Sequence, residues 1–146
     1  MIRKAALNDI PFAAKLACIL WDGEEDKRQS EFSQLISRDD CAVFIDYEND
    51  LPVAFAQCQL RRDYVEGTET SPVGYLEGIF VCEEYRHQGR ARALLATCEN
   101  WSRAQGCTEF ASDCELTNEV SLLFHLRMGF IEANRIICFT KQLAKE

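Results

Sequence analysis

The first third of the chain carries two stretches whose apolar residues recur at helical spacing. Residues 10–21 are largely apolar, follow capping candidates at 8–9 and have Pro11 near the first turn, as is typical of a helix start. Residues 24–38 open with three acids and carry an apolar stripe formed by Phe32, Leu35 and Ile36. We therefore expect two helices here, after a short first strand within 1–7.

The middle of the chain alternates or runs apolar over short stretches, which indicates strands. Residues 41–47 and 51–60 are rich in β-branched and aromatic residues and are separated by the turn Glu48-Asn49-Asp50, so they predict a hairpin. Residues 73–81 predict a third strand. Gly78 interrupts this strand, and a glycine at such a place marks a bulge or a close backbone approach.

The last part of the chain returns to a strand and helix alternation. A long amphipathic helix is predicted from about 91 to 104, followed by a short strand at 109–112 and a helix at 118–128. The tail at 131–143 reads as one or two further strands. Consecutive strands followed by strand–helix–strand order predict a mixed α/β sheet with helices on both faces.

Length and charge narrow the classes of function. The 146 residues suit one domain, and no apolar run approaches the roughly 20 residues of a membrane helix, so no membrane span is expected. The start, Met1-Ile2-Arg3-Lys4, is not followed by an uninterrupted apolar stretch and a small-residue cleavage site, so no signal peptide is expected. The net charge of −8 argues against a nucleic-acid partner, which would need a basic field. It is compatible with a cationic substrate and equally with ordinary surface acidity.

The eight cysteines do not form a recognisable framework. None of them makes a C-x-x-C pair, and no spacing with the two histidines suits zinc, so no metal is expected. Most lie within apolar segments, where cysteine acts as a small hydrophobic residue. A reducing cytoplasm is the natural location for such a chain.

The strongest chemical signal lies between the strand at 73–81 and the helix at 91–104. The most basic stretch of this acidic chain opens that helix, and it comprises Arg86, His87, Gln88, Gly89, Arg90, Ala91 and Arg92. Gly89 lets the backbone curl close to an anion, where the helix N-terminus presents unpaired N–H groups. The segment predicts a pyrophosphate site, although a solvated basic loop before an ordinary helix would have the same composition.

These residues resemble a known family. Arg-x-x-Gly-x-Ala after a strand is similar to the acetyl-CoA loop of the GNAT superfamily of N-acetyltransferases, and Asn118, Ser121 and Gly129-Phe130 match its later helix and turn. Several blocks resemble the chromosomal type of aminoglycoside 6'-N-acetyltransferases, namely Arg62-Asp63-Tyr64-Val65, Ser71-Pro72-Val73, Leu76-Glu77-Gly78-Ile79-Phe80-Val81, Gly106-Cys107 and Ala111-Ser112-Asp113. The resemblance covers about residues 3–140.

The resemblance implies a fold and a cosubstrate. It implies a single GNAT domain over 1–146, with a mostly antiparallel, splayed sheet of about six to seven strands and about four helices. Acetyl-CoA would lie with its pyrophosphate on the basic loop and its pantetheine arm along the free backbone of Ile79, Phe80 and Val81. Asn118 would contact the cosubstrate, although its position also suits a helix N-cap.

The resemblance also implies the acceptor site. Glu77 and Asp113 would bind the cationic amine and accept its proton, with Asp113 favoured as the principal acceptor through water. Local reasoning leaves a structural ion pair with an arginine open for Glu77 and a turn role open for Asp113. Trp21 and Tyr64 would contact the substrate, where a core tryptophan and a loop tyrosine are the local alternatives.

The chain departs from the family pattern at two places. His125 stands where most members carry a tyrosine proposed to protonate the leaving thiolate, so either the imidazole donates this proton or His125 is a surface residue. Asn134 stands where related enzymes carry a substrate-contacting glutamate, with Glu132 close by. One carboxylate fewer would alter which aminoglycosides bind.

The expected activity is therefore acetyl transfer from acetyl-CoA to the 6'-amino group of aminoglycoside antibiotics, which confers resistance. The alternatives are a GNAT enzyme for another cationic amine, such as a polyamine or a protein amine, and a non-catalytic CoA-binding module. A cytoplasmic homodimer is expected from the family, with neither a nucleic acid nor a membrane as partner.

Overall fold

In the computed structural model, which describes residues 1–146, the chain forms two compact units, Met1–Asp113 and Cys114–Glu146. The first unit contains β1 (Ile2–Lys4), η1 (Leu7–Asp9), α1 (Ile10–Trp21), α2 (Glu25–Ile36), β2 (Cys41–Glu48), β3 (Leu51–Arg61), β4 (Val73–Val81), η2 (Glu83–Tyr85), α3 (Arg90–Ala104) and β5 (Phe110–Ser112). The predicted helices and strands of this unit are confirmed, with α2 ending slightly earlier than expected. None of the helices has the length and apolar character needed to cross a membrane.

The strands form one sheet in the order β1-β2-β3-β4-β5. The first four pair antiparallel, which confirms the predicted hairpin, and β5 runs parallel to β4. The sheet thus has 5 strands, and the expected six to seven is wrong. The class, a mixed and mostly antiparallel sheet with helices, is the predicted one.

Strands β4 and β5 stay together over a short distance only. Their register joins Gly74–Leu76 to Phe110–Ser112, and beyond Leu76 the edge of β4 has no pairing with β5. On its other edge β4 shifts register against β3, where Gln57 pairs with Gly78 but Cys58 pairs with Leu76. The extra residue is Glu77, so the bulge that Gly78 predicted lies at the point where the two strands part.

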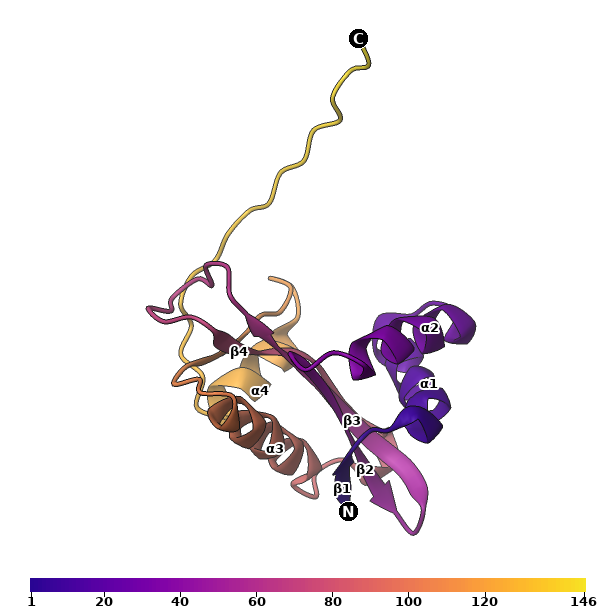
Figure 1. The fold of residues 1–146 in the computed structure, drawn as a ribbon. Coiled ribbons are helices and arrows are strands. Elements are labelled where there is room, and N and C mark those ends of the chain that lie inside the picture. Colours follow the sequence, from indigo (N-terminus) through magenta and orange to yellow (C-terminus); the bar gives the residue numbers. More distant parts are fainter. The chain divides into compact units, whose positions relative to one another are not determined.

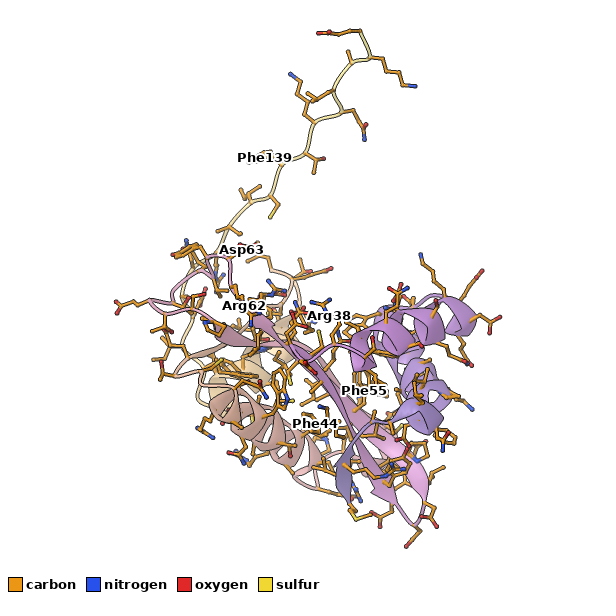
Figure 2. The ribbon with its side chains drawn as sticks, in the orientation of Figure 1. Arg38, Phe44, Phe55, Arg62, Asp63 and Phe139 are labelled. Carbon is orange, nitrogen blue, oxygen red and sulfur yellow. The ribbon has the colours of Figure 1, made fainter.

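Helices cover both faces of the sheet in this unit, with α1 and α2 on one side and α3 on the other (Figure 1). Phe55 of β3 points towards α1 and α2, where its ring meets Trp21 and Phe32 edge to face (Figure 2). Because side chains alternate along a strand, the buried neighbours of Phe55 on β3 point to the opposite face of the sheet, which α3 covers. That helix buries Leu94, Leu95 and Cys98. The alternation therefore sets which strand residues border each helical layer.

The second unit contains α4 (Glu119–Arg127), which begins and ends within a residue of its predicted bounds. Asn118 caps it, because its side-chain oxygen accepts a hydrogen bond from the backbone N–H of Ser121 at 3.1 Å. The structure has no strand in the tail at 131–143, so the strands expected there are wrong. A strand exists only as a hydrogen-bonded pair, and the residue pattern of one segment does not specify a partner.

Candidate active site

A two-pronged ion pair holds Glu77 at the bulge of β4. Arg61, the last residue of β3, donates from Nε to the Glu77 carboxylate at 3.0 Å and from one terminal nitrogen to both of its oxygens at 2.8 and 3.0 Å. The side chain of Glu77 is 20% exposed, and that of Arg61 is 37% exposed. The ion pair with an arginine, which the sequence left open for Glu77, is therefore present.

The same arginine reaches Tyr75, which in turn bonds the second carboxylate. The Arg61 Cζ lies 3.5 Å from the centre of the Tyr75 ring, and the Tyr75 hydroxyl donates to Asp113. Burial and the neighbouring Asp113 raise the pKa of Tyr75, so the hydroxyl keeps its proton at neutral pH. Glu77 and Asp113 are thus joined through Arg61 and Tyr75 in one row of contacts, which we call the carboxylate row.

A cavity of about 290 Å³ opens between this face of the sheet and the first two helices. Its lining residues are Trp21, Arg28, Glu31, Phe32, Leu35, Gln57 and Glu77. The Arg28 Cζ lies 5.2 Å from the centre of the Trp21 ring, and Arg28 pairs with Glu31 at 2.9 Å. An aromatic face beside carboxylates suits a ligand that carries ammonium groups.

Gly78 is required for Trp21 to lie in this cavity. A Cβ built at Gly78 would stand 2.1 Å from Cζ2 of the Trp21 ring, so any larger residue would displace the indole. Trp21 is 36% exposed, so it is not a core residue. Tyr64, by contrast, is 77% exposed in the loop after β3 and does not line the cavity.

The predicted phosphate loop ends in a glycine with open space above it. Gly89 is the N-cap of α3 with φ +79°, and a Cβ built there would meet no atom within 4 Å. The first α-helical bond runs from the Ala93 N–H to the Gly89 carbonyl. The N–H groups of residues 90–92, including Ala91 and Arg92, therefore precede the helical ladder and point out of the helix end. This arrangement suits an anion.

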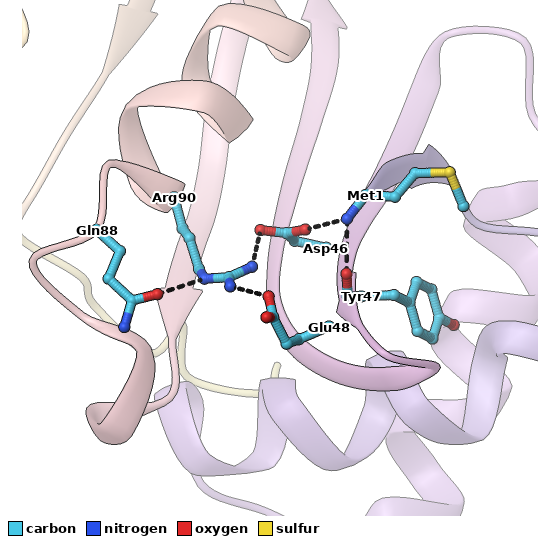
Figure 3. Close-up of polar contacts among 6 residues, drawn as sticks. All are labelled: Met1, Asp46, Tyr47, Glu48, Gln88 and Arg90. Carbon is cyan, nitrogen blue, oxygen red and sulfur yellow. Dashed lines mark hydrogen bonds and ion pairs between the residues drawn. The ribbon is translucent and has the colours of Figure 1, made fainter.

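Two of the three arginine side chains of this loop turn towards the protein. Arg90 pairs with Asp46 at 2.9 Å and also with Glu48, both on β2, while Asp46 accepts a bond from the amino group of Met1 (Figure 3). Arg86 donates from Nε to the Val81 carbonyl at 2.8 Å. Two carboxylates therefore hold the Arg90 guanidinium in the structure, and its place in the predicted phosphate site stays a prediction. The backbone of Val81, which was expected to be free, has its carbonyl bonded by Arg86.

Gln88 and His87 complete the loop. The Gln88 side-chain oxygen accepts from Nε of Arg90 at 3.3 Å, so this side chain supports Arg90. His87 has φ +61°, a left-handed conformation that is uncommon for residues other than glycine. The loop backbone is therefore shaped by two positive φ values close together, at His87 and Gly89.

His125 of α4 has one ring nitrogen committed within its own helix. Its Nδ1 lies 2.6 Å from the Ser121 carbonyl, which can only accept, so Nδ1 carries the hydrogen. The neutral ring then has an unprotonated Nε2, and only the imidazolium could donate from Nε2. The rings of Phe124 and Phe130 contact His125 at centre distances of 5.6 and 5.0 Å.

Asn134 and its neighbours make local bonds in the second unit. The Asn134 side-chain oxygen accepts from the backbone N–H of Arg135 at 2.8 Å. Arg135 also pairs with Glu132 and lowers the pKa of that carboxyl. Glu132 is therefore paired with Arg135 in the structure.

Arg61 and Tyr75 are the residues of this site that sequence reasoning missed. Arg61 ends a strand and Tyr75 lies within an apolar strand, so the local sequence pattern gives neither residue a functional role. The only feature of the sequence that pointed to Arg61 was Glu77 itself, because a glutamate within a buried strand needs a partner of opposite charge. Which arginine would pair depended on the register between β3 and β4, which the pattern does not specify.

Comparisons with known proteins show which family this chain is similar to. The model of the acetyltransferase (GNAT) family matches residues 8–130. The aminoglycoside N(6')-acetyltransferase type 1 of Acinetobacter baumannii is 40% identical over 129 residues, which is 88% of each chain. That of Stenotrophomonas maltophilia is 38% identical over 97% of this chain and 93% of its own.

Solved structures of such enzymes also superpose closely. The crystal structure of the aminoglycoside antibiotic 6'-N-acetyltransferase AAC(6')-Ih from Acinetobacter baumannii matches with a TM-score of 0.95 at 36% identity, covering 99% of both chains. AAC(6')-Iy in complex with the bisubstrate analogue CoA-S-monomethyl-acetylneamine matches with a TM-score of 0.93 at 33% identity, covering 98% of both. The chain therefore belongs to the acetyltransferase (GNAT) family, among relatives named aminoglycoside N(6')-acetyltransferases.

Proposed function

We propose that this protein transfers the acetyl group of acetyl-CoA to the 6'-amino group of aminoglycosides. The observation that carries the proposal is the carboxylate row, because it places Glu77 and Asp113 on one face at the point where β4 parts from β5. Relatives bearing this activity in their names cover most of the chain. Antibiotic resistance would be the consequence in a cell.

Acetyl-CoA is the cosubstrate in this proposal, held mainly by backbone groups. The edge of β4 beyond Leu76 has no pairing with β5, so the N–H and C=O groups of Ile79 and Phe80 that point there are available to the pantetheine arm. The N–H groups at the start of α3 would bind the pyrophosphate, and Arg92 would approach it from the first turn. The amide nitrogen of Asn118 is the group left for the cosubstrate, since its oxygen caps α4.

The acceptor would bind in the cavity over Trp21. Its ammonium groups would meet the indole face and the carboxylates of Glu77 and Glu31, which line the same cavity. Tyr64 would join only by movement of its exposed loop. Asn134 would supply a neutral contact, because Glu132 is already paired with Arg135.

Proton transfer defines the catalytic roles in the proposal. A new N–C bond forms as the C–S bond of the thioester breaks, so the amine must lose a proton and the thiolate must gain one. Asp113 is the principal proton acceptor, directly or through water, and Glu77 orients the amine. His125 would protonate the thiolate only as an imidazolium donating from Nε2, because Nδ1 is bound to Ser121.

The two units act together as one acetyltransferase domain in this proposal, since the family match at residues 8–130 spans the boundary after Asp113. We expect a homodimer in the cytoplasm, where the eight thiols, all free in the structure, stay reduced. The net charge of −8 suits a cationic small molecule and disfavours nucleic acid. No membrane or metal enters the proposed reaction.

Acetyl-transfer assays with kanamycin and tobramycin, beside spermidine and a lysine peptide, test the proposal. We expect the highest kcat/KM for an aminoglycoside and growth of a susceptible host on kanamycin when the protein is expressed. Turnover of spermidine or peptide without turnover of either antibiotic would identify an enzyme for another amine. Calorimetric binding of acetyl-CoA without turnover of any amine would identify a non-catalytic module.

A further inference from the structure

Arg61 contacts both halves of the carboxylate row. Its guanidinium bonds Glu77 through two nitrogens, and its Cζ lies over the ring of Tyr75, whose hydroxyl bonds Asp113. A planar guanidinium with two parallel bonds restricts the orientation of a carboxylate far more than a point charge would. The positions of Glu77 and of the Tyr75 ring are therefore both set by this one side chain.

The two carboxylates differ in whether a cationic side chain pairs with them. Glu77 is paired with the cation Arg61, so the pair carries no net charge. Asp113 is bonded by the Tyr75 hydroxyl, which is a neutral donor and brings no opposite charge. Arg28 and Glu31 of α2, which face the same cavity, pair with each other and add no net charge.

We propose that Arg61 is a positioning residue that neutralises Glu77 and leaves Asp113 as the carboxylate that attracts the substrate ammonium and takes its proton. The inference rests on the proposed function and deepens it. Without Arg61, Glu77 would be an unpaired anion that stabilises the ammonium form of the bound amine and so opposes its deprotonation. With Arg61, Glu77 accepts a hydrogen bond from the amine without holding it as a cation.

A purely structural role for Arg61 predicts something else. Partly exposed ion pairs contribute little to stability, so loss of this one should not unfold the protein. A structural role would lower the melting temperature or scale the activity uniformly. It would not move the pH at which activity appears, whereas a change of net charge beside the reacting amine must do so.

The test is the pH profile of kcat and KM for kanamycin in charge-changing variants. In Arg61→Met the unpaired Glu77 should move the acid limb of the kcat profile to higher pH, by about 0.5 to 1 unit, and lower KM about threefold. In Glu77→Gln the unpaired Arg61 should move the limb to lower pH and raise KM. The double variant restores neutrality, so its limb should return close to that of the wild type.

Two further variants separate charge from geometry. Arg61→Lys keeps the charge but loses the two-pronged bond, so its acid limb should stay in place while kcat falls. Arg38→Met is the matched control, because Arg38 makes the same kind of two-pronged bond to Asp40, at 2.9 and 2.8 Å, and neither residue lines the cavity. It should leave both limb and KM unchanged.

The outcomes separate this inference from the function on which it rests. Opposite shifts in the single variants that cancel in the double variant support the role of Arg61. Wild-type turnover of kanamycin with shifts that are absent, equal in direction or reproduced by Arg38→Met would overturn that role alone. A wild-type protein that turns over neither antibiotic would overturn the proposed function and this inference with it.

Discussion

The two candidate binding regions of the first unit are built from different parts of the chain. The candidate phosphate loop is one run of consecutive residues, 86–92, and the N–H groups of its last three residues point out of the end of α3. The acceptor cavity uses side chains from α1, α2, β3 and β4, brought together from positions 21 to 77. A backbone site depends on local conformation, whereas a side-chain site depends on how distant segments pack. Substitutions should therefore act locally in the first region and through neighbours in the second.

The largest expected effect is at the acceptor side, on the proton path. Asp113→Asn removes the acceptor and its charge while keeping the shape, so kcat should fall by roughly 10²–10⁴-fold. Glu77→Gln should lose less kcat and affect KM instead, because Glu77 is neutralised by Arg61. Steady-state kinetics with kanamycin measure both. Near-normal kcat and KM in the double variant would remove the carboxylate row from the active site.

The next effect lies at the phosphate loop. Gly89→Asp adds bulk and negative charge in the open space above the helix end, and we expect acetyl-CoA affinity to fall at least about tenfold, or 1.4 kcal/mol. Gly106→Asp is the matched control, because Gly106 also has positive φ and open space but lies beyond the other end of α3. Calorimetry on both folded variants measures their affinity for acetyl-CoA. Equal losses of affinity would show that the effect comes from backbone strain and not from the phosphate site.

A smaller effect is expected from the aromatic wall of the cavity. Trp21→Ala should raise KM for the aminoglycoside several-fold, as loss of about 1 kcal/mol of cation–aromatic attraction predicts, and leave KM for acetyl-CoA nearly unchanged. Gly78→Ala should reproduce this, because its new Cβ would overlap the Trp21 ring. Combining the two changes should cost little more than Trp21→Ala alone. A double variant much worse than either single would mean that Gly78 serves another purpose.

The smallest effect tests whether the Arg90 side chain belongs to the phosphate site. Arg90→Gln should lower the melting temperature slightly, since Asp46 and Glu48 of β2 lose the guanidinium that they share and Asp46 keeps only the Met1 amino group as a cationic partner. It should change acetyl-CoA affinity less than Arg92→Gln does. Thermal unfolding and calorimetry measure the two quantities. A larger loss of acetyl-CoA affinity in Arg90→Gln than in Arg92→Gln would show that the Arg90 side chain contributes directly to the phosphate site.

The sequence predicted local secondary structure well, but it did not predict which distant residues and strands contact each other. The helix α1, the hairpin of β2 and β3, the bulge near Gly78 and the cap at Asn118 all follow from residue types within a few positions of one another. The strands predicted at 131–143 are absent from the structure, because the β-propensity of a segment does not specify a strand for it to pair with. Tyr64 was expected at the substrate, yet its loop leaves it exposed outside the cavity.

By itself the sequence determined the acetyltransferase family, the backbone curl at Gly89 and the two carboxylates, because each is a property of a residue and its neighbours in the chain. Only the tertiary structure decided that Arg61 neutralises Glu77, that Tyr75 bonds Asp113 and that Arg90 is held by β2. These pairings depend on strand register and on helix placement. A shift of one residue in the register of β3 would turn Arg61 to the opposite face of the sheet, so charge in this site is set by packing and not by composition.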